Sequence, residues 1–427
     1  MRRSHGTHRR HTTSPYERRS LGPRILLVAL VVVVVLVAAA GAFVGVQLNR
    51  ATPAAAVTVV LDRNLGIPGV PPHLPVPAGG ATVVTVQGVG TVASVRPDVA
   101  LPLASITKLV TALVVLRHHP LSLGQSGPAL SVPASLAAAY PSQLAAHDSL
   151  IPLHAGEHLS ELQALEALLI PSADNVAQLL ATWTSGTMPA FVAAMNAEAA
   201  RLGLHQTHLA DASGLSAGSV GSAADLIRLA RVVMAQPLLR AIVAMPQVTL
   251  PLAGTVYNYD YDLGHDGIVG IKTGSTIAAG GDFLFAARRS VHGRRVLVMG
   301  AVLGQQGRQP LPQVLAVAER LAVAAPAGLE KVTVLPAGRT VLRFRTAWGA
   351  SATAVTTRAV QAWVRPGDHL AATVHLDGPA SAPLRSLRAG QQVASVSVVT
   401  PTGTVTVPVT AVQGFRGPAL RWRLERG

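Results

Sequence analysis

A serine and a lysine stand three residues apart in the segment ASITKL, at Ser105 and Lys108, directly before the apolar run VTALVVL. If this segment is helical, that separation places both side chains on one face, near enough for the lysine amine to accept the serine's proton. The N-terminus of the helix would favour the negative charge that develops when the serine attacks a carbonyl. The pattern therefore suits a nucleophile with its base, although Ser105 would also suit an ordinary helix cap.

The scarcity of lysine favours the catalytic interpretation. Of the 35 basic residues, only Lys108, Lys272 and Lys331 are lysines, so arginine supplies the ordinary surface charge. An arginine side chain keeps its proton at every ordinary pH, whereas a desolvated lysine can lose it and act as a base. Lys272 lies in GIKTGST, a segment that also suits a catalytic site.

Two further segments complete an ordered set of three motifs. LLIPSADNVAQLLA holds Ser172 after a proline, and GIKTGST places Lys272, Thr273 and Gly274 on a predicted strand. Penicillin-binding proteins and class A β-lactamases carry Ser-x-x-Lys, a Ser-Asp-Asn box and Lys-Thr-Gly in their sites. Each motif alone is common by chance, but all three in order are specific.

On these residues, the chain over 81–326 resembles the low-molecular-mass penicillin-binding proteins of the D-alanyl-D-alanine carboxypeptidase type, the S11 serine peptidases. GEHLSELQALEALLIPSADNVA resembles the approach to the family's second motif, LGLHQTHLADASGLS its Asp-Gly-Leu loop, and KTGSTIAAGGDFLFAARR its third motif and following strand. The resemblance implies an α+β fold of the β-lactamase/transpeptidase type, in which an antiparallel sheet packs with a helical cluster. The β-rich tail resembles the C-terminal domain of many members.

The resemblance also implies roles for the reacting side chains. Ser105 is the nucleophile that forms an acyl ester, and Lys108 is the base that activates it. Ser172 passes a proton toward the leaving D-alanine. These roles suit the chemistry, because a hydroxyl needs a neighbouring base before it attacks a carbonyl. Ser172 also suits a cap of the helix that follows it, and the two roles are compatible.

Four residues of the third motif are implied to bind the substrate. Lys272 and Thr273 hold its terminal carboxylate, which needs a cationic partner. The backbone N–H groups of Ser105 and Ser275 form the oxyanion hole for the developing negative charge. Gly274 lacks a side chain, which lets the substrate backbone lie against the strand.

The second motif departs from the family's usual Ser-x-Asn, because the third position from Ser172 is Asp174 and the asparagine follows at Asn175. If the register is kept, a carboxylate that can only accept hydrogen bonds lies where an amide normally donates, and it holds Lys108 as an ammonium. If the turn is slipped by one residue, Asn175 enters the site and Asp174 faces the helix N-terminus. The apolar stripe of the following helix favours Asp174, since a slip would rotate that stripe by about 100°.

Composition along the chain predicts a basic cytoplasmic tail at 1–24, a transmembrane helix at 25–46, an Ala/Pro/Gly-rich linker at 47–80 and a β-rich domain at 329–427. The resemblance implies that the remaining region, 81–328, is a penicillin-binding serine peptidase domain. The run from 25 to 46 contains 22 residues without a charge, which is enough to cross a bilayer as a helix. The arginine-rich flank predicts a cytoplasmic N-terminus and an extracytoplasmic catalytic domain, so a single-pass protein of the cell membrane is expected. A cleaved signal peptide is the alternative, since residues 38–42 offer small side chains for cleavage, but its apolar core is usually shorter.

Periodicity within 81–328 predicts strands, a helical middle and strands again, which indicates a sheet with helices packed against it. The predicted strands are 81–86, 91–95, 267–275, 282–290 and 294–304, and the predicted helices are 104–116, 160–170, 175–183, 188–204, 223–234 and 311–324. From Lys331 onward, short alternating segments separated by Gly and Pro predict an all-β domain.

Several classes of function are disfavoured by composition. Cysteine is absent, which excludes disulfides and thiolate chemistry. The net charge of +15 includes seven arginines within the first 24 residues, and the remaining surplus is scattered with few aromatics, so nucleic-acid binding is not expected. His147, His154 and His158 lack the spacing of a zinc site, so neither a metal nor another cofactor is predicted.

Three functions remain open. The favoured one is a membrane-anchored carboxypeptidase that acts on peptidoglycan pentapeptide stems and takes β-lactams as covalent inhibitors. A β-lactamase would need a base for the deacylating water, and the usual Glu-x-x-Leu-Asn motif does not follow the second box. A wall sensor or binding protein that kept the fold with weakened catalysis is the third, and the unusual SADN segment leaves room for it.

Overall fold

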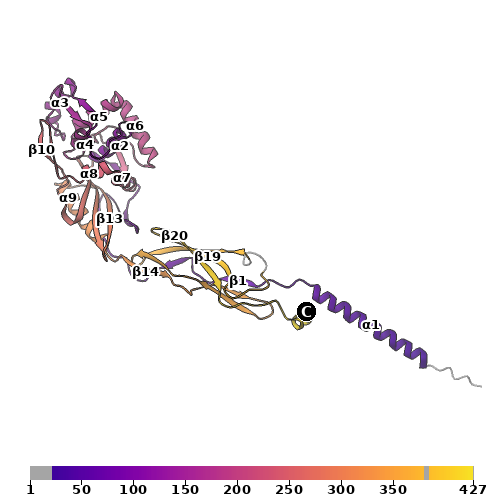
Figure 1. Cartoon of the computed structure of the whole chain (residues 1–427). Helices are drawn as coiled ribbons and strands as arrows, with labels where there is room; N and C mark the ends of the chain where they lie inside the picture. The colour runs from indigo at the N-terminus through magenta and orange to yellow at the C-terminus, as the bar shows by residue number, and fades with distance from the viewer. Residues whose placement is uncertain (1–21, 379–383, 427) are drawn as a thin grey trace, which may run out of the picture.

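The computed structural model describes residues 22–378 and 384–426, which form a long helix, a strand-rich domain and a mixed α+β domain in a row (Figure 1). The predicted tail of residues 1–24 lies outside the described residues except for its last three. The helix is α1 (Gly22–Asn49), and the strand-rich β domain lies between it and the α+β domain. The α+β domain runs from β3 to α9, whose bounds are given below.

A five-stranded antiparallel sheet forms the centre of the α+β domain, in the order β11-β12-β13-β3-β4. The strands are β3 (Ala81–Val86), β4 (Gly90–Val95), β11 (Ile268–Thr276), β12 (Gly280–Val291) and β13 (Arg294–Gln305). His292 and Gly293, with φ of 48° and 77°, connect β12 to β13, as expected for the tight hairpin turn that matches the twist of antiparallel strands.

Both faces of this sheet are covered, and the side chains of β12 alternate between them. Phe283 and Phe285 pack in one hydrophobic cluster with α9 (Pro310–Ala324), whereas Leu284 and Ala286 belong to the larger cluster on the opposite face. The alternation follows from the two-residue period of a strand. Since neither face meets solvent, β3 is buried along its whole length and shows no polar face.

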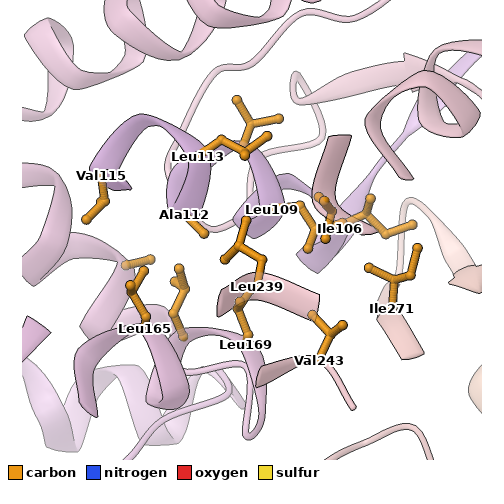
Figure 2. Close-up of a cluster of buried hydrophobic side chains, with 14 of the residues drawn as sticks. Ile106, Leu109, Ala112, Leu113, Val115, Leu165, Leu169, Leu239, Val243 and Ile271 are labelled. Carbon is orange, nitrogen blue, oxygen red and sulfur yellow. The ribbon is translucent and has the colours of Figure 1, made fainter. Parts of the chain in front are cut away.

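The larger cluster surrounds α2 (Lys108–His118), the helix that follows the predicted nucleophile (Figure 2). Side chains of α2 such as Leu109 and Ala112 meet Leu165 and Leu169 of a second helix and Leu239 of a third. The cluster is built from α4 (Glu161–Leu169), α5 (Asp174–Ser185), α6 (Met188–Arg201), α7 (Ala223–Ala235) and α8 (Pro237–Ile242). A helix buried on nearly all sides reads as a continuous apolar run, as VTALVVL does.

The predicted sequence of strands, helices and strands is confirmed, and so is the α+β class. Within the α+β domain, two helices were not expected from periodicity: α8 and α3 (Ala134–Ala145). Helix α3 contains Pro141 and buries none of its side chains fully, so it lacks an apolar stripe. The remaining short elements are β5 (Ala100–Pro102), η1 (Ala104–Thr107), β6 (Ala129–Ser131), β7 (His158–Ser160), β8 (Val220–Ser222), β9 (Gln247–Leu250), β10 (Gly254–Tyr257) and η2 (His265–Gly267).

The β domain contains a seven-stranded sheet in the order β1-β15-β16-β20-β19-β18-β2 and a separate pair, β14 with β17. The strands that follow the α+β domain are β14 (Glu330–Leu335), β15 (Thr340–Arg345), β16 (Ser351–Thr356), β17 (Val360–Val364), β18 (His369–Leu376), β19 (Gln392–Thr400) and β20 (Gly403–Ala411). Alternate side chains of these strands enclose a core of their own, as the period of two predicts.

The prediction that residues 47–80 form only a linker is wrong in part. Two stretches of it are strands at the edges of the β-domain sheet: β1 (Ala56–Val59) pairs with β15, and β2 (Asn64–Gly66) pairs with β18. Strands of four and three residues are too short to show an alternating pattern, and the Ala- and Pro-rich segments around them favour the prediction of a linker. The chain therefore crosses the β domain twice, once before and once after the α+β domain.

The C-terminal end of the described chain returns to α1. Helix α10 (Leu420–Glu425) lies against the end of α1 that faces the β domain, where Figure 1 marks the C-terminus. The guanidinium of Arg426 donates to the carbonyls of Gln47 and Arg50 at 3.0 and 2.7 Å, and Arg423 donates to that of Leu48. The last carbonyls of a helix lack intrahelical partners, so these arginines satisfy them and complement the negative end of its dipole.

Candidate active site

Ser105 lies in η1, the single 3₁₀ turn that leads into α2. The preceding residue, Ala104, has φ of +43°, a conformation that side chains other than glycine rarely adopt. Neither η1 nor α2 has a side-chain cap bond, and their N-cap positions are Leu103 and Thr107. The simpler interpretation of Ser105 as a helix cap is therefore wrong, and a strained turn holds its hydroxyl at the edge of the site.

The amine of Lys108 is fully buried and contacts three groups that converge from distant parts of the chain. It donates to the hydroxyl of Ser105 at 2.7 Å and to the carbonyl of Ser213 at 3.0 Å. Its third neighbour is a carboxylate oxygen of Asp174, at 2.6 Å. The nucleophile and its base predicted from Ser-x-x-Lys are thus within hydrogen-bond reach of each other.

Asp174 is the first residue of α5, and its carboxylate lies between Lys108 and a neighbouring loop. One oxygen forms the 2.6 Å ion pair with Lys108, and the other accepts from the backbone N–H of Ser149 at 2.9 Å. The N–H of Asp174 in turn donates to the carbonyl of Ser149 at 2.7 Å. Because both charged groups are buried, solvent screens this ion pair little.

Asn175 turns away from Lys108 and holds a different segment. Its amide donates to the carbonyl of Ile151 at 2.7 Å and accepts from the same residue's N–H at 3.4 Å, with the side chain almost completely buried. Of the two registers considered for SADN, the structure has the one in which Asp174 faces the lysine. The reason is the apolar stripe of α5, which includes Val176, Leu179 and Leu180 and is buried in the helical cluster.

Ser172 precedes α5 and has φ of +61°. Its side chain is 2% exposed, and within the described residues its hydroxyl has no hydrogen-bond partner. The prediction that it caps the next helix is wrong, because Ala173 is the N-cap of α5 and no side chain bonds there. A buried hydroxyl without a partner is costly, so this one suits a group that acts once a substrate has entered.

The third motif lies on β11, which runs beside the turn that carries Ser105. A Cβ atom at Gly274 would lie 3.0 Å from the carbonyl oxygen of Leu103 and 3.2 Å from the N–H nitrogen of Ser105. Glycine is thus needed here for contact with the nucleophile's own turn, whereas the sequence pointed to contact with substrate backbone. Lys272 and Thr273 are buried beside it, and Ser275 is exposed on the rim of the cavity described below.

Burial of Lys272, and after it the charge of Lys108, lower the pKa of Lys272 to about 7. Asp174 and Asp260 act in the opposite direction with smaller effects. Its amine donates to the carbonyl of Thr273 at 3.2 Å. The amine is thus poised between its charged and neutral forms near neutral pH.

This pKa predicts a pH dependence of substrate capture. If Lys272 binds the substrate carboxylate, its ammonium is needed, and that form is lost as the pH rises through about 7. We expect kcat/KM to fall about tenfold between pH 6 and pH 8, mainly through KM. Acylation by penicillin, which carries a carboxylate, should show the same loss. A profile of kcat/KM that is flat over this range would contradict the prediction.

A loop formed by ADASGLS supplies the carbonyl that contacts Lys108. The carboxylate of Asp211 accepts from the backbone N–H groups of Gly214 and Leu215 and from the hydroxyls of Ser213 and Ser219, at 2.5 to 2.9 Å. This agrees with the sequence interpretation of Asp211 and Ser213 as residues that shape a loop. The sequence did not predict that the carbonyl of Ser213 would reach the Lys108 amine.

A cavity of about 440 Å³ opens above Ser105. Its walls come from four segments: the turn with Ser105, the 146–149 loop with Asp174, the 214–215 loop, and residues 275–278 after β11. His147, Asp148 and Ser149 in this wall were not among the predicted site residues. No motif marks them, and only the pairing of Ser149 with Asp174, 25 residues later, brings their loop to the site.

Curated relatives of this chain are enzymes that act on D-alanyl-D-alanine peptides. A D-alanyl-D-alanine endopeptidase of Pseudomonas aeruginosa is 36% identical over 174 residues, which covers 40% of this chain and 53% of that protein. A D-alanyl-D-alanine carboxypeptidase of Mycobacterium tuberculosis is 34% identical over 208 residues, covering 47% of this chain and 66% of that protein. The chain thus spans about half to two thirds of the length of these relatives.

Solved structures give the same fold. A DD-transpeptidase of Streptomyces K15 superposes with a TM-score of 0.53 at 24% identity, covering 60% of this chain and 99% of that one. A D-alanyl-D-alanine carboxypeptidase from Mycobacterium tuberculosis superposes with a TM-score of 0.50 at 29% identity, covering 59% and 94%. The predicted β-lactamase/transpeptidase type of fold is confirmed. The family model of the peptidase S11 D-alanyl-D-alanine carboxypeptidases matches residues 71–305, more than half of the chain, and this chain therefore belongs to that family.

Proposed function

We propose that this protein is a serine-type D-Ala-D-Ala carboxypeptidase, anchored in the membrane, that removes the terminal D-alanine from peptidoglycan stem peptides. The observation that carries the proposal is the 2.7 Å contact between the hydroxyl of Ser105 and the buried amine of Lys108. Membership of the S11 family supports the substrate class. Peptidoglycan pentapeptide stems are the proposed substrates, and β-lactams are the proposed covalent inhibitors.

The reaction would proceed in two steps. The Ser105 oxygen attacks the carbonyl carbon of the penultimate D-alanine while Lys108 takes the hydroxyl proton, and the N–H groups of Ser105 and Ser275 stabilise the oxyanion. The C–N bond then breaks, a proton passes through Ser172 to the amine of the departing D-alanine, and an acyl ester remains on Ser105. Water hydrolyses this ester, which releases the shortened peptide and restores the serine hydroxyl.

In the same proposal, Lys272 and Thr273 orient the substrate by holding its terminal carboxylate. Lys272 is 2% exposed, so a carboxylate that reaches it is largely removed from water, and their attraction is stronger than at the surface. A β-lactam carries a carboxylate next to its reactive amide and would enter the same arrangement. Its ring opens on acylation, but the leaving nitrogen stays attached to the acyl group, so the ester persists.

One observation favours a second candidate, a slow enzyme or a wall sensor. Asp174 lies 2.6 Å from the Lys108 amine and holds it in an ion pair, where the amine is less available to accept the proton of Ser105. Such a site would still form the acyl-enzyme with penicillin, but slowly, and it would bind stem peptides with little turnover. A β-lactamase is not proposed, since the sequence lacks its deacylation motif.

Two measurements on the purified full-length protein test the proposed activity. D-alanine release from a peptide ending in D-Ala-D-Ala should be detectable and should stop after treatment with penicillin. Mass analysis of the treated protein should place one penicilloyl group on the peptide that contains Ser105. A penicilloyl group on any other residue would refute the assigned nucleophile. Penicillin labelling of Ser105 without D-alanine release would favour the sensor.

The placement in the membrane is also part of the proposal. One helix in the described part of the chain, Arg24–Asn49, is long and apolar enough to cross a membrane, and a helix this close to the N-terminus can also be a signal sequence. We expect it to be retained, with the β domain and the α+β domain outside the cytoplasm. In cell fractionation, full-length protein should sediment with membranes, and a variant lacking residues 1–49 should not. Intact protein found only in the soluble fraction would contradict the anchor.

A further inference from the structure

Residues 146–149 form a loop that lines the cavity and belongs to none of the three motifs. This loop directly follows α3. The N–H of His147 bonds to the carbonyl of Leu144, and the N–H of Asp148 bonds to that of Gln143. With His147 at φ of +62°, this is the left-handed helix ending in which two backbone bonds close the last turn. The position of Asp148 is therefore set by backbone hydrogen bonds on its N-terminal side.

The loop is fixed on its other side as well. Ser149, the next residue, exchanges two hydrogen bonds with Asp174, one through its N–H at 2.9 Å and one through its carbonyl at 2.7 Å. Asp148 thus lies between two fixed points and lines the same cavity as Ser105. Because the backbone on both sides of Asp148 is fixed, binding a peptide beside this carboxylate costs little ordering of the loop.

The charges of the neighbouring groups leave Asp148 without a counter-ion. The Lys108 ammonium is in contact with Asp174. Among the described residues, Asp148 has neither an ion pair nor a side-chain hydrogen bond. Partial burial, and then the Asp174 carboxylate, raise the pKa of Asp148, while Lys108 acts against them. The wall of the cavity therefore carries an acidic group that a cation from outside would stabilise.

We propose that Asp148 determines specificity by pairing with a free ammonium group of the peptide bound in this cavity. In a stem peptide, the residue before D-Ala-D-Ala is a diamino acid, whose side-chain amine is charged in free stems and becomes a neutral amide once it is cross-linked. A carboxylate in the cavity wall would attract the charged amine of a free stem and would not attract the neutral amide of a cross-linked stem. The inference rests on the proposed function and deepens it: the enzyme acts on uncross-linked stems as a carboxypeptidase and disfavours cross-linked ones.

The test uses two peptides that differ in one charge, Nα-acetyl-L-lysyl-D-alanyl-D-alanine and its Nε-acetylated form. The full-length protein should release D-alanine from the free amine with a kcat/KM about two- to fivefold higher, and the preference should shrink in about 1 M salt. Asp148→Asn should abolish the preference by lowering kcat/KM for the free amine alone. Asp148→Glu should restore part of it. Asp98→Asn, which removes the same charge from an exposed position outside the cavity, should leave the preference unchanged.

Other outcomes overturn the proposal. Equal kcat/KM values for the two peptides with the wild-type protein would do so directly. An equal loss for both peptides in Asp148→Asn would instead assign a general base or a structural role to this carboxylate. If neither peptide yields D-alanine, the proposed activity fails, but the inference is still tested by protection of Ser105 from a fluorescent penicillin. Stronger protection by the free amine would then support it, and equal protection would refute it.

Discussion

Ser105→Ala will abolish covalent labelling by penicillin and will lower D-alanine release by about 10³-fold or more. The reason is geometric: among the described residues, the only hydroxyl that bonds to the Lys108 amine is that of Ser105, at 2.7 Å. Ser172 does not replace it, because its buried hydroxyl has no hydrogen bond to the lysine. Loss of the serine oxygen therefore removes the atom that forms the acyl ester.

The fold should survive this substitution. Ser105 caps neither η1 nor α2, and alanine suits both elements. The thermal midpoint of Ser105→Ala should stay within a few degrees of that of the wild type, measured by circular dichroism. Ser122→Ala, at an exposed serine remote from the cavity, serves as the matched control and should label fully. Wild-type labelling of Ser105→Ala would contradict the assigned nucleophile.

Asp174→Asn will raise the rate at which penicillin acylates Ser105, by about ten- to hundredfold at neutral pH. The carboxylate of Asp174 lies 2.6 Å from the Lys108 amine inside the protein, where solvent screens the interaction little. An asparagine of nearly the same shape removes the negative charge and with it the ion pair that holds the Lys108 amine. The amine is then more available to accept the proton of Ser105.

Asn175→Ala is the control that shows which residue of SADN affects acylation. The Asn175 side chain satisfies both backbone groups of Ile151, so its removal should lower the free energy of unfolding by about 1–3 kcal/mol. At temperatures where the variant is folded, its acylation rate should remain within about threefold of the wild type. If Asp174→Asn leaves acylation unchanged or slower while Asn175→Ala abolishes it, Asn175 is the catalytic amide and the proposed role of Asp174 is wrong.

The register of the SADN segment and the contact of its Asp174 with Ser149 depend on different kinds of information. The register of α5 could be predicted, because an apolar stripe with helical periodicity must face the core, and that stripe left Asp174 on the side of the lysine. Its contact with the backbone of Ser149 could not be predicted. Helix α3, which leads to that residue, buries none of its side chains fully and so shows no periodic pattern.

The short strands β1 and β2 show that part of the fold also depends on contacts between distant segments rather than on a local pattern. The alternation of side chains predicts the long strands of the β-domain sheet, whereas the composition around these two edge strands, of four and three residues, predicts a linker. Their structure depends on pairing with β15 and β18, more than 280 residues later in the chain. Pairing across such a distance has no local signature.

The family, the α+β class, the order of the long elements and the Ser105–Lys108 pair could be predicted from the sequence. The elements and the pair follow from spacing within a single helix or strand, where neighbours in sequence are neighbours in space. The family follows from the resemblance of three motifs in a fixed order. The groups around that pair could be identified only from the tertiary structure: the carbonyl of Ser213, the Asp174 carboxylate and Asp148 in the cavity wall. They come from segments that are distant in sequence: the loop at 211–215, the first residue of α5 and the loop that follows α3. These segments meet only when the chain is folded, so no local pattern predicts their distances.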